Sequence, residues 1–211
     1  MTTAVYFDLD STLLQYTTDF ETIFERAVPD APAGAYERYV SVLFDSFDRL
    51  STDPYYEGFS AVVSEFGVDA DPEALAARHT EAELAATTVP EQARDALARA
   101  ASRGPSGILT NGTAEMQRAK IERHGLESDV DAVIVSNDPD IAVRKPDADI
   151  FEAAEAALPA DGYVYVGDTY DEDIVGARQA GWRAFHVGTD GPDDDPMRVE
   201  SVADAVARIF D

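Results

Sequence analysis

Apolar residues gather in five short runs, each followed by polar or glycine-containing turn residues. Runs of this length, bounded by turn residues, predict β-strands. Helix-like stretches lie between the later runs and tend to end at glycine or before proline, as helices do. Strands that alternate with helices imply right-handed crossovers and a buried parallel sheet. The expected strands are Ala4–Phe7, Gly107–Leu109, Ala132–Val135, Tyr163–Val166 and Arg183–Val187, and the expected helices are Glu115–His124, Asp149–Leu158, Asp171–Ala180 and Val202–Phe210.

The segment from about residue 15 to residue 89 follows a different pattern. Its apolar residues recur at helical spacing, and the spacing is interrupted at Pro29–Gly34, Ser51–Pro54 and Gly67–Pro72. We expect four helices and no strand here, inserted between the first strand and the rest of the sheet. The predicted fold class is α/β, with a Rossmann-like parallel-sheet core domain of residues 1–14 and 89–211 and an inserted α-helical cap domain of residues 15–88.

The composition fits a globular protein with a core of its own. Of the 211 residues 45% are hydrophobic, none is cysteine, and no apolar run approaches the roughly 18 residues of a membrane span. The N-terminus has neither a basic start nor a long apolar stretch, so no signal peptide is expected. We therefore expect a soluble, cytoplasmic protein without disulfides, thiol-based metal sites or membrane spans.

Charge is strongly unbalanced, with 42 acidic against 16 basic residues and a formal net charge of −26. Such a chain repels nucleic-acid phosphates and anionic membranes, so neither is expected as a partner. The acidic surface either binds basic partners or is adapted to high salt, as in a halophile, where screening reduces self-repulsion. Acidic residues scattered over most predicted helices favour the second interpretation. Lysine occurs only at Lys120 and Lys145.

Chemistry-bearing side chains follow the ends of the predicted strands. In an open parallel sheet these ends lie at one edge, where ligands bind. Two of the side chains, Asp8 and Asp10, repel each other by about 1 kcal/mol in water, and by several times that near a partly dry surface. A cation or a shared proton would relieve that repulsion. The edge gathers Asp8, Asp10, Thr12, Thr110, Asn111, Asp168 and Asp173, and Lys145 precedes the helix that leads into the fourth strand.

These residue types suit magnesium-assisted phosphoryl transfer. Asp8, Asp10 and Asp168 offer the hard oxygen ligands that Mg²⁺ prefers. A carboxylate such as Asp8 is a competent nucleophile toward phosphorus, giving an aspartyl-phosphate intermediate. Lys145 would neutralise charge, while the Thr110 hydroxyl and the turn amides would hold the phosphoryl oxygens. Asp10 would protonate the leaving oxygen and then activate water.

Each motif alone has a simpler structural explanation. An Asp-x-Asp pair is commonly a turn or a cap, and the turn after Thr110 fits a strand-to-helix connection with Thr113 as a helix cap. Acidic residues near Asp173 would also favour a helix N-terminus. Four motifs in order on matching strand ends outweigh these separate explanations. The three histidines have no metal-ligand spacing and are expected to be structural or exposed: His79, His124 and His186.

On these residues the chain resembles the haloacid dehalogenase-like (HAD) hydrolase superfamily, in the branch with a helical cap after the first motif. The resemblance covers the whole chain. It implies that Asp8 is the nucleophile and Asp10 the general acid/base, and that Mg²⁺ is held by Asp8, Asp10 and Asp168, with Asp173 as a ligand or an outer anchor. It also implies that Thr110 and Asn111 bind the phosphoryl group and that Lys145 neutralises it. The motifs are Asp8-Leu9-Asp10-Ser11-Thr12, Thr110-Asn111, Lys145-Pro146, and Gly167-Asp168 with Asp173.

Membership of this superfamily does not fix the reaction, so the local residues must decide it. Dehalogenases of the family lack an aspartate at the position of Asp10, because halide needs no proton, so Asp10 favours phosphoryl transfer. Phosphonate-cleaving relatives use a cap lysine, which residues 15–88 do not contain. We therefore expect a Mg²⁺-dependent phosphatase acting on a small phosphorylated metabolite. A phosphomutase and a non-catalytic phosphate- or metal-binding protein remain open, as do the oligomeric state and any substrate contact by the cap arginines Arg26, Arg38, Arg49 and Arg78.

Overall fold

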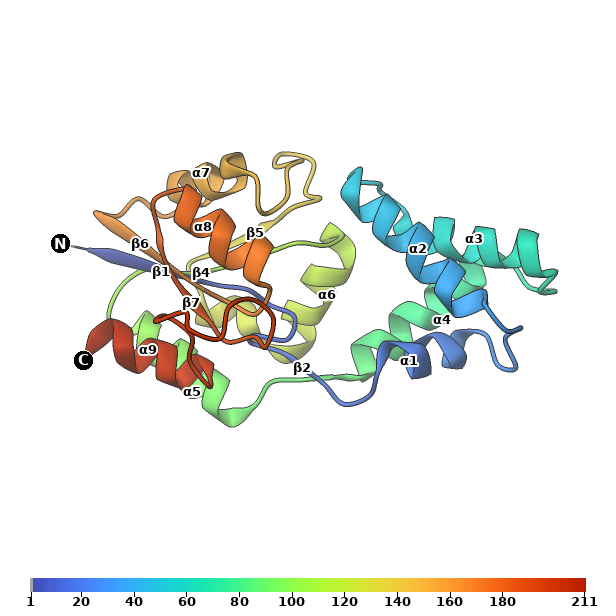
Figure 1. The fold of residues 1–211 in the computed structure, drawn as a ribbon, viewed down its shortest axis with the longest axis horizontal. Helices are drawn as coiled ribbons and strands as arrows, with labels where there is room; N and C mark the ends of the chain where they lie inside the picture. Colours follow the sequence, from blue (N-terminus) through green and yellow to red (C-terminus); the bar gives the residue numbers. More distant parts are fainter. Residues whose placement is uncertain (1) are drawn as a thin grey trace. The chain divides into compact units, whose positions relative to one another are not determined.

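The computed structural model describes residues 2–211 and divides the chain into two compact units (Figure 1). One unit comprises the chain up to Gln15 together with Thr88–Asp211, and the other comprises Tyr16–Thr87. The chain passes between them through two-residue strands, β2 (Gln15–Tyr16) and β3 (Thr87–Thr88), which pair with each other. The sequence pattern did not predict these strands, because two residues are too short to show an alternation.

The larger unit is built on a five-stranded parallel sheet in the order β5-β4-β1-β6-β7. The predicted α/β class with a parallel sheet is confirmed. From β1 the chain first adds strands on one side of the sheet and then returns to add β6 on the other. Ligands of open sheets bind where the order reverses in this way, here between β1 and β6. The strands are β1 (Thr3–Phe7), β4 (Ser106–Thr110), β5 (Ala132–Val135), β6 (Gly162–Gly167) and β7 (Arg183–His186).

Both faces of the sheet are covered, which explains the continuous apolar runs of its strands. Alternate residues of β1 enter separate cores, Val5 and Phe7 on one face and Ala4 and Tyr6 on the other. Figure 1 shows α5 and α9 on one face and α7 and α8 on the other. The covering helices are α5 (Glu91–Ala101), α6 (Ala114–His124) and α9 (Val202–Phe210) on the first face, and α7 (Ala148–Ala157) and α8 (Gly176–Gln179) on the second.

The helices of the larger unit end with the expected capping chemistry. Two of these helices differ from what the sequence pattern predicted. The Thr113 side chain accepts a hydrogen bond from Met116 N and starts α6, and Gly125, with φ 66°, ends it before a 3₁₀ turn, η1 (Leu126–Asp129). Helix α5 was not predicted, because its apolar face consists mainly of alanine. The helix expected over Asp171–Ala180 starts instead as a π-helical turn, η2 (Tyr170–Val175), before α8.

The smaller unit consists of the four expected helices: α1 (Phe20–Ala27), α2 (Ala35–Asp48), α3 (Pro54–Phe66) and α4 (Pro72–Ala85). Its core is aromatic, with Phe24 stacked on Phe59 at 5.8 Å between ring centroids and Tyr39 packed against both. His79 is buried in this core, and its Nε2 lies 3.3 Å from the Tyr39 hydroxyl. Among the helices of residues 2–211, none is long and apolar enough to cross a membrane.

Candidate active site

The loop after β1 begins with Asp8 at the reversal point of the sheet. The backbone N–H of Asp8 donates to Val166 O at 2.9 Å, which ties the end of β1 to β6. Ser11 adopts a left-handed conformation with φ 58°, and Leu14 N then donates to Leu9 O at 2.8 Å, so the loop folds back on itself. A non-glycine residue in this region is uncommon and is often found at functional sites.

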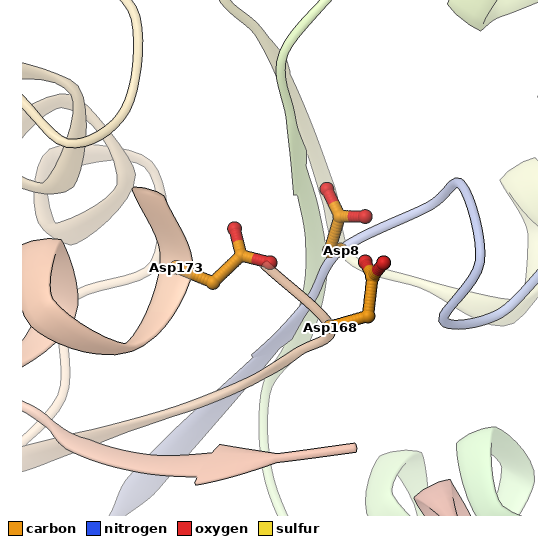
Figure 2. Close-up of side chains that lie close together, drawn as sticks. All are labelled: Asp8, Asp168 and Asp173. Atoms are coloured by element: carbon orange, nitrogen blue, oxygen red, sulfur yellow. The ribbon is translucent and has the colours of Figure 1, made fainter. Parts of the chain in front are cut away.

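Three buried or half-buried carboxylates lie together at this edge of the sheet (Figure 2). Asp8 follows β1, Asp168 follows β6, and Asp173 comes from η2; one oxygen of each lies within 4.8 Å of the others. Gly167 makes this approach possible, because a Cβ at that position would lie 2.3 Å from Asp173 Oδ2. The arrangement brings Asp8 together with two carboxylates that lie 160 and 165 positions later in the chain.

The Lys145 ammonium sits inside this acidic group. Its Nζ donates to Asp8 Oδ1 at 2.7 Å, to Asp173 Oδ1 at 2.5 Å and to the Tyr165 hydroxyl at 2.7 Å. The Tyr165 hydroxyl in turn donates to Leu109 O at 2.6 Å. Burial disfavours the ammonium form, but the charges of Asp173 and Asp8 outweigh it and hold the Lys145 pKa above its usual value. Lys145 therefore remains a fixed positive charge.

One lysine does not neutralise three carboxylates. Burial, together with the charges of Asp173 and Asp168, raises the pKa of Asp8 well above its usual value although Lys145 opposes the shift. Burial and the charge of Asp173 likewise raise the pKa of Asp168 to about 6, against the opposing effects of Lys145 and a 3.2 Å hydrogen bond from Thr12 Oγ1. When all three carboxyl groups are ionised, two negative charges on hard oxygen donors have no compensating cation, and both raised pKa values follow from this excess. This donor set fits a divalent cation such as Mg²⁺.

A separate set of contacts holds the Lys145 backbone. Asn111 accepts from Lys145 N at 2.9 Å through Oδ1 and donates to Lys145 O at 3.1 Å through Nδ2. The same Nδ2 donates to Glu172 at 2.7 Å, and Glu172 pairs with Arg144 at 2.8 Å. The Asn111 side chain is thus used to position Lys145. A phosphoryl group would then be contacted by the backbone of this turn. The phosphate contact expected of Asn111 stays a prediction.

The Asp10 carboxylate has different partners from Asp8. It accepts from Lys120 Nζ at 2.8 Å and from Gln117 Nε2 at 2.8 Å, and it does not belong to the three-carboxylate group found among residues 2–211. Gln117 Nε2 also donates to Thr110 Oγ1 at 2.8 Å. The two aspartates of the first motif, which share a strand end, are therefore held in distinct electrostatic environments. The expected role of Asp10 as a metal ligand stays a prediction.

The sequence pattern did not assign a role to Lys120, Gln117, Tyr165 or Glu172. The rarity of lysine was a signal for Lys120 in the sequence, because the chain has two lysines and the other one belongs to a motif. In the structure both lysines are about 2% exposed and contact carboxylates of the first motif. Among the histidines, His186 is buried at the end of β7, where its Nε2 lies 3.0 Å from the Asp168 carbonyl oxygen. Within residues 2–211 no histidine joins the three-carboxylate group.

A family model for haloacid dehalogenase-like hydrolases matches residues 2–181. The chain belongs to the haloacid dehalogenase-like hydrolases. Curated relatives of this hydrolase include the pyrimidine 5'-nucleotidase YjjG of Escherichia coli, 38% identical over 78 residues, which are 36% of this chain and 34% of the relative. The chain spans only about a third to two fifths of the length of the first relatives that it matches. A longer match is the ribulose-1,5-bisphosphate 5-phosphatase of Halopiger xanaduensis, 30% identical over 86% of this chain and 82% of the relative.

Solved structures of the family share the fold of this hydrolase. The magnesium-bound HAD-hydrolase YfnB of Bacillus subtilis matches with a TM-score of 0.76 and 19% identity, over 99% of this chain and 98% of that one. The L-2-haloacid dehalogenase of Xanthobacter autotrophicus matches with a TM-score of 0.74 and 21% identity, over the same shares of the two chains. At these identities the likeness establishes the fold, and the reaction has to be argued from the site.

Proposed function

We propose that the protein is a Mg²⁺-dependent phosphatase that hydrolyses phosphate monoesters through a phosphoaspartate on Asp8. The observation that carries the proposal is that the two aspartates after β1 have different contacts and lie in different electrostatic environments. Asp8 lies in the acidic group with Lys145, Asp168 and Asp173, whereas Asp10 is held by donors outside that group. A nucleophile and a proton carrier need such separate environments.

The reaction has two steps that balance on these residues. First, an Asp8 oxygen forms a bond to phosphorus while the ester P–O bond breaks, and Asp10 gives a proton to the departing oxygen. A water molecule then attacks phosphorus and gives a proton to Asp10, and the bond from phosphorus to Asp8 breaks to release phosphate. Lys145 and the Thr110 hydroxyl stabilise the charge on the transferring group.

The metal would be held by the group of Asp8, Asp168 and Asp173, whose charge and hard oxygens fit it. When bound, Mg²⁺ supplies positive charge to the phosphoryl oxygens and to the nucleophile's surroundings. Asp173 also accepts from Lys145 and from Thr169 N at 3.0 Å, so its carboxylate is fixed from two sides.

Two observations favour a phosphatase over a dehalogenase. Halide departs without a proton, so dehalogenation does not use the proton that Asp10 gives to a departing oxygen in phosphate ester hydrolysis. The curated relatives bear the names of phosphatases or nucleotidases of small phosphate esters: phosphoserine, glyceraldehyde 3-phosphate and ribulose bisphosphate among them. A small phosphorylated metabolite is therefore the proposed substrate class.

We further propose that the helical unit acts as the cap that selects the leaving group. Arg38 pairs with Glu65 at 2.7 Å, and Arg49 pairs with Glu57. The expected contact of a cap arginine with a second anionic group of the substrate stays open among the four arginines of the unit.

The test is phosphate release from a broad panel of phosphate monoesters, with Mg²⁺ and with a chelator, in salt-supplemented buffer. We expect activity with Mg²⁺, and its loss in Asp8→Asn while the surface variant Asp149→Asn stays active. A folded wild-type protein that releases no phosphate from the panel would favour the non-catalytic binding function. Release of halide from a 2-haloacid would favour a dehalogenase instead.

A further inference from the structure

Helix α6 carries a buried lysine and a buried glutamine one turn apart, both directed at Asp10. Lys120 and Gln117 are each about 2% exposed. Residues three apart lie on the same helix face, so the pair reaches one target together. Lys120 Nζ donates to Asp10 Oδ1 and Gln117 Nε2 to Asp10 Oδ2, each at 2.8 Å. Both oxygens of one carboxylate are thus held from a single helix.

The turn before α6 is shaped to admit this contact. Gly112 has φ 140°, and a Cβ there would lie 2.9 Å from Gln117 Cδ. The next residue, Thr113, caps the helix and so fixes its register. A larger residue at position 112 would push Gln117 away from Asp10. The glycine, the cap and the two donors together determine where the Asp10 carboxylate points.

Burial of a lysine is costly unless its charge is paired, so its place inside the protein calls for a reason. A tether between α6 and the loop after β1 would be one such reason. The geometry shows more than a tether, because Gln117 Nε2 also donates to Thr110 Oγ1 at 2.8 Å. The glutamine thereby sets the spacing between Asp10 and the hydroxyl expected to hold the phosphoryl group.

We propose that Lys120 and Gln117 are positioning residues that orient Asp10 for proton delivery to the leaving oxygen. The inference rests on the proposed phosphatase function. Both contacts are donated to Asp10, so the proton that it delivers sits on an oxygen lone pair that neither donor occupies and points away from α6. The carboxyl plane does not rotate about its Cβ–Cγ bond without losing a hydrogen bond to α6. Proton transfer requires a donor placed within hydrogen-bond reach of the departing oxygen, so a rotating Asp10 would deliver its proton poorly.

This role predicts a dependence on the leaving group that a tether does not. Phenol is a weak acid with a pKa of about 10 and needs a proton as it leaves, whereas the more acidic para-nitrophenol departs readily as its anion. The two esters are close in size, so a binding defect affects both alike. The parameter to compare is kcat/KM, which covers the steps up to departure of the phenol and omits the later hydrolysis of the phosphoaspartate.

The experiment measures kcat/KM of wild type, Lys120→Met and Gln117→Met with phenyl phosphate and with para-nitrophenyl phosphate, at saturating Mg²⁺. The matched control is Arg118→Met on the same helix, which breaks an exposed ion pair with Asp138. We expect Lys120→Met to lose about 10- to 100-fold with phenyl phosphate and less than about threefold with para-nitrophenyl phosphate, and Arg118→Met to change neither. Gln117→Met should shift the ratio in the same direction and decides the matter if Lys120→Met does not fold.

Equal losses with both esters, or no loss in folded variants, would overturn the positioning role and leave the phosphatase function standing. A wild-type protein that hydrolyses neither ester nor any other phosphate monoester would overturn both proposals together. The ratio of the two kcat/KM values thus separates the two failures.

Discussion

Lys145 and Asp8 form an ion pair of 2.7 Å between side chains that are 2% and 9% exposed. The Lys145 ammonium is also held by Asp173 and by the Tyr165 hydroxyl, so its position is fixed by three contacts. A charge fixed next to the nucleophile stabilises the negative charge of a transferring phosphoryl group without moving during the reaction. The same contact also makes the stability of the protein dependent on one lysine.

Replacement of that lysine by methionine, Lys145→Met, should damage both stability and activity. It leaves Asp8 and Asp173 buried without their cation, and breaking a buried pair in this way costs about 3–5 kcal/mol of unfolding free energy. Urea unfolding at neutral pH in a chelator measures the loss. The exposed pair variant Arg94→Met, which loses a contact with Asp129, is expected to cost at most about 1 kcal/mol. Equal unfolding free energies for Lys145→Met and wild type would contradict this prediction.

The carboxylates and Lys145 could be located from the sequence because each belongs to a strand end or a short motif. Asp8 and Asp168 directly follow apolar runs, and a parallel sheet brings such positions to one edge. The same reasoning could not place Lys120 or Gln117, which lie 110 and 107 positions from Asp10 and depend on how α6 packs. Helix α5 was missed because alanines give a weak hydrophobic pattern, and the π-turn of η2 has no periodicity of its own.

A methyl group at Gly167 should disrupt the acidic group. In Gly167→Ala the new Cβ would lie 2.3 Å from Asp173 Oδ2 and 2.7 Å from Asp173 Cβ, so the whole Asp173 side chain has to move. We expect Mg²⁺ affinity to fall by about tenfold or more and phosphatase activity to fall with it. Titration calorimetry with Mg²⁺ measures the affinity directly.

The control for this substitution lies on the same strand. A Cβ at Gly162 would meet no atom within 4 Å, so Gly162→Ala should bind Mg²⁺ as wild type does. Wild-type affinity in Gly167→Ala would show that the Asp173 carboxylate does not take part in binding the metal.

Salt should stabilise the folded protein. The formal charge of −26 makes the compact state repel itself, and the screening length falls from about 10 Å at 0.1 M salt to about 3 Å at 1 M. We expect the free energy of unfolding to rise between these concentrations of KCl. A sucrose series of equal osmolality separates screening from general exclusion effects, and equal stability at low and molar KCl would contradict a salt-adapted surface.

Binding of Mg²⁺ should weaken as the pH falls through about 6. Asp168 has a pKa of about 6 in the metal-free protein, so below that value a proton occupies the carboxylate and must be released before a metal binds. The raised pKa of Asp8 acts in the same direction. We expect the affinity to fall by about tenfold or more for each pH unit below 6, measured by titration calorimetry between pH 5 and pH 7.5.

The same shift determines the sign of the stability change in a chelator. The folded pKa of Asp168, about 6, lies above its ordinary value of 3.8, so the folded state binds the proton more tightly than the unfolded state. Its contribution to stability is therefore complete below about pH 4 and is lost as the pH rises to about 6. Asp168→Asn removes that charge and should be more stable than wild type at pH 7 by on the order of 1–3 kcal/mol, but not at pH 4. Added Mg²⁺ should reverse the ranking at pH 7, because it binds and stabilises wild type more strongly. A wild-type protein whose Mg²⁺ affinity does not change between pH 5 and pH 7.5 would contradict the assignment of Asp168 to the metal site.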